Sequence, residues 1–349
     1  MNNDKDCLLV APSVVTPPQQ QTSGTRWLPS LSRARFTSLV VIVSVFAICV
    51  LVYLVPEREV HHGTVAVVTS IAPTLDTSTR KTSTKIRYKH TQRRLPQCII
   101  IGVRKAGTRA LIKFLDLHPS IQTAAREIHF FDHSYELGLN WYRKRMPFSF
   151  PDQITVEKTP AYFTVKSVPK LVHRMNSTVK LLLIVRDPFE RTVSDWLQLC
   201  MNQRAKNRHC TSFERKVIDP RTGEVNRSYQ GIRRSIYVHH MQHWLQWFPL
   251  SQIHIVNGKT LVENPVAALQ RVEQFLGLDH RITEDHFYFN KSRGFYCIQY
   301  DSTRRKCLHP SKGRKHPKIK TEVVEKLREF FCPFNHKFYQ MVGQDFGWP

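Results

Sequence analysis

The sequence is short of acidic residues. It has 27 Asp and Glu against 52 Lys and Arg, so its formal net charge is +25 over 349 residues. Such an excess of positive charge favours polyanionic partners, namely nucleic acids, anionic lipids or acidic polysaccharides. The aromatic RNP motif, zinc-finger spacings and RGG tracts of nucleic-acid-binding modules are all missing. We therefore expect no nucleic acid partner.

One long apolar run lies near the N-terminus. Residues 36–55 carry no charge and are about as many as a membrane-spanning helix needs. Arginines precede this run and Glu57 and Glu59 follow it, so the positive-inside rule predicts a cytoplasmic tail over 1–35 and a transmembrane signal anchor over 36–55. Residues 56–94 turn to Thr, Ser, Pro, Val, Lys and Arg without hydrophobic periodicity, which is typical of an extended lumenal stem. Behind such an anchor, the available polyanions are glycosaminoglycans.

The remainder, 95–349, is expected to be globular. Apolar strand candidates at 98–103, 154–157, 180–185 and 252–256 alternate with helical patterns. Helices are expected after the first and third strands, over 236–248, from Asn264-Pro265 to Gly277, and over 321–331. This alternation predicts an α/β fold with a central parallel sheet flanked by helices, and ligands at the carboxyl ends of its strands.

No Walker A loop is present, because that motif places its Lys after the last Gly. Instead, the strand at 98–103 runs into the turn Arg104-Lys105-Ala106-Gly107-Thr108-Arg109, and a helical pattern follows. A strand, a short basic turn and a helix direct backbone N–H groups and the helix dipole at an anion. The Lys-x-Gly-Thr order resembles the 5′-phosphosulfate loop of sulfotransferases, which use 3′-phosphoadenosine 5′-phosphosulfate (PAPS). The alternative is an ordinary strand–turn–helix with solvated basic residues.

A second anion-site candidate follows the strand at 180–185. This strand ends in Arg186-Asp187-Pro188, and the next helix carries Ser194. Arg186 and Ser194 are suited to a second phosphate, such as the 3′-phosphate of PAPS. Alone, the segment is only a helix start capped by Asp with Pro at its first position.

Acid–base candidates come from two further segments. If residues 126–132 are extended, Glu127 and His129 point to the same side and form an acid–base pair. The alternative is a surface strand with a satisfied histidine. The strand at 154–157 leads to Lys158, which is expected at the mouth of the same cleft. Tyr162 and Phe163 are candidates for either core packing or substrate contact.

Cysteines and glycosylation sequons fit an oxidising compartment. Cys297 and Cys307 flank a short polar loop and are disulfide candidates; Cys200 and Cys210 have weaker support. Cys98 lies in the first strand and is expected to be a free buried thiol. Cysteine spacing typical of metal sites is absent. Three Asn-x-Ser/Thr sequons are candidates for glycosylation: Asn176, Asn226 and Asn290.

Taken together, these segments resemble the heparan sulfate glucosamine 3-O-sulfotransferases over about 95–349. The matching segments, in chain order, are VRKAGTRAL, EIHFFD, VEKTPAYF, LLLIVRDP, SIYVHHMQHWL, FYFNKSRGFYC and SKGRKHP. The C-terminal PFNHKFYQ and GWP are most similar to the fifth vertebrate isoform. One departure is Ala106, which stands where the family usually has a second Gly; the family's site would lose cofactor affinity there if the position required a positive φ or a close backbone approach.

The resemblance implies a PAPS-dependent sulfotransferase fold with a P-loop-like 5′-phosphosulfate loop, in a single-pass type II protein of the Golgi membrane. Its acceptor is implied to be heparan sulfate or heparin, and no metal is required. Glu127 is implied to be the catalytic base, supported by Lys105 and His129, and Cys297–Cys307 to be a disulfide. The implied cofactor-binding residues are Arg104, Lys105, Ala106, Gly107, Thr108, Arg109, Arg186, Ser194, Tyr296, Lys312, Gly313, Arg314, Lys315 and His316. The implied saccharide-binding residues are Arg109, Asp132, Lys158, Thr159, Pro160 and Ala161.

The implied chemistry suits these residue types. Glu127 would take the proton from a glucosamine 3-hydroxyl as its oxygen attacks sulfur in line. Lys105 would neutralise the charge that grows on the departing phosphate oxygen.

Three other functions are weighed against this one. A heparan sulfate-binding protein without catalysis is disfavoured by the intact set of Lys105, Glu127, Arg186 and Ser194. Sulfation at another position is disfavoured by EIHFFD and VEKTPAYF. A nucleotide kinase is disfavoured by the missing Walker register and the absence of an Mg²⁺-binding Asp.

Overall fold

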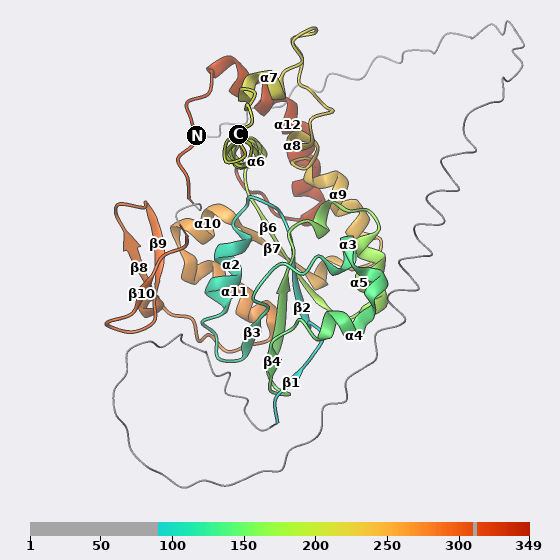
Figure 1. Ribbon diagram of the computed structural model, residues 1–349, viewed down its shortest axis with the longest axis vertical. Coiled ribbons are helices and arrows are strands. Elements are labelled where there is room, and N and C mark those ends of the chain that lie inside the picture. Colours follow the sequence, from blue (N-terminus) through green and yellow to red (C-terminus); the bar gives the residue numbers. More distant parts are fainter. Residues whose placement is uncertain (1–89, 310–312) are drawn as a thin grey trace, which may run out of the picture. The chain divides into compact units, whose positions relative to one another are not determined.

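The computed structural model describes residues 90–309 and 313–349 (Figure 1). The predicted cytoplasmic tail, transmembrane anchor and most of the stem lie outside these residues, and so does Lys312. Within the part that is described, no helix is both long and apolar enough to cross a bilayer.

A five-stranded parallel sheet forms the centre of the domain, in the order β3-β5-β2-β6-β7. Its strands are β2 (Cys98–Gly102), β3 (Ile121–Thr123), β5 (Ile154–Lys158), β6 (Lys180–Val185) and β7 (Ile253–Asn257). All four predicted strands are present, and β6 has the predicted bounds. Every residue of β2 is buried, as its continuous apolar run indicates for a strand covered on both faces.

The strand order creates a switch point between β2 and β6. After β2 the chain continues to β3 and β5 on one side, whereas after β6 it continues to β7 on the other. The segments that leave β2 and β6 therefore diverge and open a crevice at the carboxyl edge of the sheet. Open α/β sheets bind ligands at such points.

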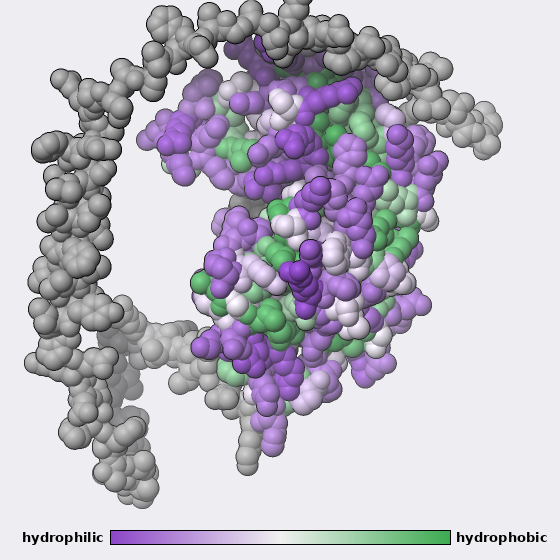
Figure 2. All heavy atoms as spheres, turned by 90° about the vertical axis from the view of Figure 1, so that its right-hand side faces the viewer, coloured by the Kyte–Doolittle hydropathy of each residue, from purple (hydrophilic) through white to green (hydrophobic). Residues whose placement is uncertain are grey.

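Helices cover both faces of this sheet. Figure 1 shows α2, α10 and α11 on one side and α3, α5 and α9 on the other. The helices are α2 (Thr108–Leu115), α3 (Phe130–His133), α4 (Gly138–Arg143), α5 (Val168–Met175), α6 (Pro188–Arg204), α7 (Phe213–Val217), α8 (Gln230–Arg233), α9 (Tyr237–Leu245), α10 (Gly258–Glu263), α11 (Pro265–Leu276) and α12 (Thr321–Val342). Hydrophilic side chains dominate the face of the domain drawn in Figure 2.

The helix-capping residues act as the sequence predicts. The Asp187 carboxylate accepts from the backbone N–H of Phe189 at the start of α6, with a donor–acceptor distance of 2.7 Å. Asn264 caps α11 in the same way, and Gly277 ends that helix in the left-handed conformation with φ of 77°.

Two expectations about local structure are wrong. Residues 126–132 do not form a strand: an irregular segment leads into α3, and His129 adopts a positive φ of 55°. Helix α12 does not end near 331 but continues through Pro333 to Val342, because Phe331, Phe338 and Val342 remain on its buried face.

Two small antiparallel sheets complete the fold. One pairs β1 (Gln92–Arg93) with β4 (Phe148–Ser149). The other has the order β10-β9-β8, with β8 at Phe287–Asn290, β9 at Phe295–Gln299 and β10 at Arg305–Lys306. Strand β9 contacts α10, which places this second sheet at the edge of the domain (Figure 1).

Candidate active site

A cavity of about 800 Å³ lies at the carboxyl ends of β2 and β6. It collects most of the residues that the sequence singles out. The predicted residues that line it are Arg104, Lys105, Ala106, Gly107, Thr108, Arg109, Glu127, His129, Pro160, Ala161, Arg186, Ser194, Tyr296, Gly313, Arg314 and His316. The described residues Asp132, Lys158, Thr159 and Lys315 are not part of its lining.

The turn after β2 places two residues in the left-handed region, Lys105 with φ of 77° and Gly107 with φ of 118°. Ala106 is not among the residues with positive φ, so its methyl group causes no strain of that kind. The close approach in this turn comes from Gly258 of α10, where a Cβ atom would lie 2.9 Å from the Ala106 carbonyl oxygen. Gly107 and Thr108 line the cavity, so the N-terminus of α2 borders it and can bind an anion.

A buried carboxylate supports this turn from behind. Asp195 of α6 is fully buried, and its Oδ1 lies 3.0 Å from Nε of Arg104. Its Oδ2 lies 3.3 Å from Nη1 of Arg191 and 3.7 Å from Nη1 of Arg234. Arg191 also donates to the backbone carbonyl of Arg104 at 3.3 Å. One carboxylate therefore fixes both the side chain and the backbone of Arg104.

Asp195 is not among the residues predicted from sequence. The signal that was available is its spacing from Arg191, because residues four apart on a helix are neighbours. The burial of the pair is a tertiary property that this spacing does not reveal.

Helix α6 presents a polar stripe to the cavity at four-residue spacing: Glu190, Ser194 and Gln198. Oε2 of Glu190 accepts from Nη2 of Arg186 at 2.9 Å and lies 2.8 Å from Nδ1 of His316. The hydrogen bond to His316 is the main reason why the pKa of Glu190 is lowered. Glu190 thereby links the turn after β6 to the basic segment 313–316.

Gln198 makes a second link across the cavity. Its Oε1 accepts from Nη1 of Arg314 at 2.9 Å and from Nζ of Lys105 at 3.5 Å. Glu190 and Gln198 were not predicted, although the helical spacing from Ser194 points to both. Other cationic and aromatic residues that line the cavity and were not predicted are Phe114, Lys259, Arg293, Phe295, Phe346 and Trp348.

The opposite side of the cavity contains a carboxylate and an imidazole. Nζ of Lys158 donates to Oε1 of Glu127. Nε2 of His129 lies 3.7 Å from Oε2 of Glu127, and Nδ1 of His129 lies 2.8 Å from Oδ2 of Asp132. Glu127 and His129 thus lie together as predicted, but on an irregular segment rather than on a strand.

Contrary to the prediction, Lys158 does not project into the cavity. Its side chain is only 2% exposed, whereas that of Glu127 is 35% exposed. Strand β5 ends inside the domain, so the lysine reaches Glu127 from the buried side. Lys158 therefore supports Glu127 and leaves the cavity to the carboxylate.

The charges around Glu127 keep it ionised. Partial burial raises the pKa of this carboxyl, but the hydrogen bond and charge of Lys158 lower it, and so do the charges of Arg109 and His129; the net effect is a lowered pKa. Burial lowers the pKa of Lys158, which the pairing with Glu127 opposes. An ionised carboxylate that faces the cavity can accept a proton.

Residues behind this pair fix its backbone. Thr159 Oγ1 accepts from the backbone N–H groups of Ile128 and His129 at 3.2 and 3.3 Å, so Thr159 positions the segment instead of lining the cavity. Its own hydroxyl donates to the carboxyl of Glu157. Burial raises the pKa of Glu157 to about 7.

The sequence leaves two roles open for Tyr162 and Phe163, core packing and substrate contact. In the structure both residues belong to the core. Both are essentially inaccessible to solvent. The Tyr162 hydroxyl accepts from the backbone N–H of Phe130 at 2.9 Å, which holds the start of α3.

The structure contains the disulfides Cys297–Cys307 and Cys200–Cys210, and Cys98 is a free buried cysteine. The first of these disulfides ties β9 to the segment that leads toward the basic residues 313–316. In each of the three sequons, the side-chain oxygen of Asn accepts from the hydroxyl group two residues later: Asn176 from Thr178, Asn226 from Ser228, and Asn290 from Ser292. Their glycosylation stays a prediction.

The fold and the site match known proteins. The family model "Sulfotransferase domain" matches residues 95–342. A solved sulfotransferase from Alicyclobacillus acidocaldarius has the same fold, with a TM-score of 0.54, 16% identity, and coverage of 72% of this chain and 97% of that chain. The chain is therefore a sulfotransferase by domain class, with the predicted central parallel sheet flanked by helices.

Similar curated proteins show which family of sulfotransferases the chain belongs to. The human heparan sulfate glucosamine 3-O-sulfotransferase 5 is 49% identical over 267 residues, which cover 76% of this chain and 77% of the relative. The mouse protein of the same name is 51% identical over 257 residues, and these cover 73% of this chain and 74% of the relative. This chain belongs to the heparan sulfate glucosamine 3-O-sulfotransferase family.

Proposed function

We propose that this chain transfers a sulfonate group from PAPS to the 3-hydroxyl of glucosamine residues in heparan sulfate, with Glu127 as the general base. The observation that carries the proposal is the arrangement of the cavity. The basic turns after β2 and β6 both line it, and so does the carboxylate of Glu127, whose pKa is lowered. Membership of the family supports the choice of acceptor and position.

The residues of the first side fit PAPS. A cavity of about 800 Å³ has room for a nucleotide. Its turn after β2 and the N-terminus of α2 suit the 5′-phosphosulfate, and Arg186 with Ser194 suits the 3′-phosphate. The segment Gly313, Arg314 and His316, held by Glu190 and Gln198, closes the same side. When bound, PAPS supplies the sulfonate group.

The residues of the second side act on the acceptor. Glu127 accepts the proton of the 3-hydroxyl while the oxygen–sulfur bond forms and the bond from sulfur to the phosphate oxygen breaks. Lys105 and Arg104 balance the negative charge on the phosphate that departs. Lys158 holds the Glu127 carboxylate in place, and Asp132 orients the His129 ring through Nδ1.

The proposal includes the location of the protein. The apolar run 36–55, preceded by arginines, supports a single-pass type II protein of the Golgi membrane with the catalytic domain in the lumen. The disulfide pairs and the sequons favour the same compartment.

Transfer of ³⁵S from labelled PAPS to heparan sulfate by the full-length chain in detergent tests this function. Disaccharide mapping of the product then locates the label. We expect the label on the glucosamine 3-hydroxyl. Label at another position would overturn the acceptor assignment, and polysaccharide binding without transfer would favour the non-catalytic binding protein.

A further inference from the structure

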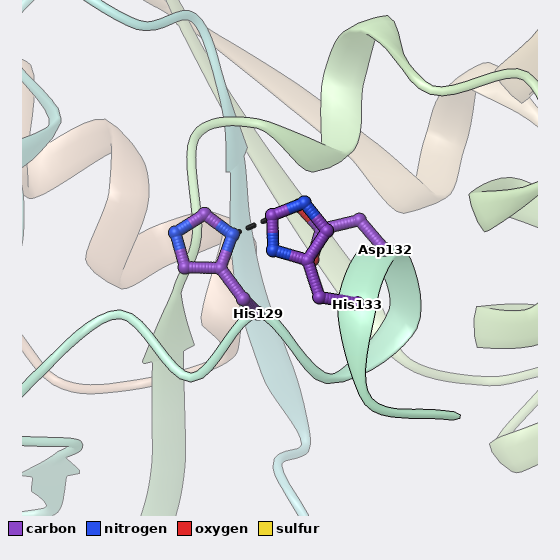
Figure 3. A group of neighbouring side chains, drawn as sticks. All are labelled: His129, Asp132 and His133. Atoms are coloured by element: carbon purple, nitrogen blue, oxygen red, sulfur yellow. Dashed lines mark hydrogen bonds and ion pairs between the residues drawn. The ribbon is translucent and has the colours of Figure 1, made fainter. Parts of the chain in front are cut away.

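Three potential metal ligands lie together beside the proposed base: His129, Asp132 and His133. One donor atom from each lies within 4.8 Å of the others. Figure 3 shows His129 on the segment that leads into α3 and the other two residues on that helix, with the two imidazole rings next to each other. The ring centroids are 5.0 Å apart and the ring planes differ by 10°.

His129 lies just before the short helix α3 and His133 is its last residue, and their rings lie 5.0 Å apart, centroid to centroid. Oδ2 of Asp132 lies between them, 2.8 Å from Nδ1 of His129 and 3.8 Å from Nε2 of His133. Two imidazoles and one carboxylate, with a fourth position open, are a donor set that zinc prefers.

The Asp132 side chain gives a second, independent observation. It is only 3% exposed, and its Oδ1 has no hydrogen-bond partner among the described residues. A buried carboxylate oxygen without a partner is costly. A dication at this cluster would interact with that carboxylate, whose only described contacts are with the two histidines.

The side chains have the freedom to close around an ion. Ligand atoms in a tetrahedral zinc site lie about 3.4 Å apart, so the cluster must contract by roughly an ångström. His133 is 69% exposed and can make this movement. The nearby positive charge of Lys158 is paired with Glu127, which limits its repulsion of the ion.

We propose that His129, Asp132 and His133 form an inhibitory Zn²⁺ site that regulates the proposed sulfonate transfer. This inference rests on the proposed function. In the metal-free chain, Nδ1 of His129 lies 2.8 Å from Oδ2 of Asp132, and Nε2 of the same ring lies 3.7 Å from Oε2 of Glu127. Zinc bound by this ring therefore places a dication beside the Glu127 carboxylate, and the two opposite charges attract each other. The carboxylate is then held toward the ion and away from the acceptor hydroxyl.

The test compares the full-length chain with His133→Ala, because His133 does not line the cavity and has no role in the proposed transfer. Zinc binding is measured first, by competition with a chromophoric chelator without PAPS or polysaccharide. Inhibition of ³⁵S transfer by Zn²⁺ is measured next. His209→Ala, which removes an exposed histidine in another segment, is the matched control.

We expect zinc to reduce the turnover of the parent chain and of His209→Ala by about tenfold or more, since it holds back a base that contributes about 10²–10⁴-fold. His133→Ala should keep its metal-free activity and bind zinc at least about tenfold more weakly. Equal zinc affinity in His133→Ala and the parent chain, or no zinc binding at all, would overturn the site. The chelator measurement decides whether the site exists even if no variant transfers sulfonate, so failure of the proposed function is distinguished from failure of the zinc site.

Discussion

The two sides of the cavity pair a buried charge with an exposed one, but with opposite signs. On the cofactor side, the buried member is the carboxylate Asp195, and Arg104, with 41% of its side chain exposed, borders the cavity. On the acceptor side, the buried member is the cation Lys158, and the carboxylate Glu127 borders the cavity. In both cases the buried charge orients the exposed one, and the sign of the exposed charge decides what that side can bind or accept.

The two sides also differ in the ratio of positive to negative charges. Asp195 is shared by the guanidinium groups of Arg104, Arg191 and Arg234, so the cofactor side keeps an excess of positive charge. Lys158 forms its ion pair with Glu127, so on the acceptor side one positive and one negative charge offset each other. A surplus of cations suits a ligand with several negative charges, whereas a neutral pair suits a base that gains one proton.

The largest effect is expected from Asp195→Asn, which breaks the cofactor side. Removing one partner from a buried ion network leaves the others uncompensated and costs about 3–5 kcal/mol of folding free energy. The same change releases Arg104, so affinity for the nucleotide product should also fall. Urea unfolding and calorimetry with 3′-phosphoadenosine 5′-phosphate measure the two effects.

Asp219→Asn is the matched control for this prediction, because Asp219 pairs with Arg221 on the surface. Its unfolding free energy should change by less than about 0.5 kcal/mol. If Asp195→Asn were equally harmless, the buried network would not hold the turn after β2.

Glu157→Gln sharpens the contrast on the acceptor side, because Glu157 supplies a second carboxyl there, adjacent to Lys158 on β5. Burial raises the pKa of Glu157 from 4.5 to about 7 in the folded protein. The folded state therefore holds a proton that the unfolded state releases, so this group's contribution to stability is lost as pH rises from about 4.5 to 7. The difference corresponds to roughly 3 kcal/mol.

In Glu157→Gln this pH-dependent contribution is absent. We expect the variant to gain stability over the parent chain between pH 5 and pH 7.5, as measured by urea unfolding at both values. An identical pH dependence of the two proteins would show that Glu157 titrates normally in the folded state.

The smallest effect is expected from Arg186→Ala, which removes one cation from the cofactor side and leaves Asp195 intact. A charged hydrogen bond contributes about 1.5–3 kcal/mol, so the dissociation constant for 3′-phosphoadenosine 5′-phosphate should rise about ten- to hundredfold. Arg174→Ala, an exposed position on α5, should not change it. An unchanged dissociation constant in Arg186→Ala would remove this residue from the phosphate site.

Sequence alone predicts much of this arrangement, for identifiable reasons. The strands β2 and β6 are continuous apolar runs, and Asp187-Pro188 and Asn264-Pro265 are strong helix starts. Once parallel strands are assigned, their carboxyl ends must lie at one edge, so the turns at 104–109 and 186–188 are brought together. Short elements such as β3 and β10 give no usable periodicity and were missed.

What sequence could not supply is the direction of side chains across the interior. Lys158 is a predicted site residue and Asp195 follows one directly, and nothing in the local sequence indicates that both are buried. Their burial depends on partners about thirty to ninety positions away, Glu127 for the first and Arg104 for the second. The local sequence of α6 likewise does not indicate that Arg234 is the third partner of Asp195.

The central claim is that the exposed charge on the acceptor side, Glu127, removes the proton from the acceptor hydroxyl. Single-turnover ³⁵S transfer at saturating PAPS and heparan sulfate tests it most directly, with Glu127→Gln compared against the parent chain and against Glu136→Gln, a change at an exposed carboxyl. We predict that Glu127→Gln slows transfer by about 10²–10⁴-fold while both ligands still bind, and that Glu136→Gln transfers at the parent rate. Transfer by Glu127→Gln at the parent rate would contradict this role for the carboxylate.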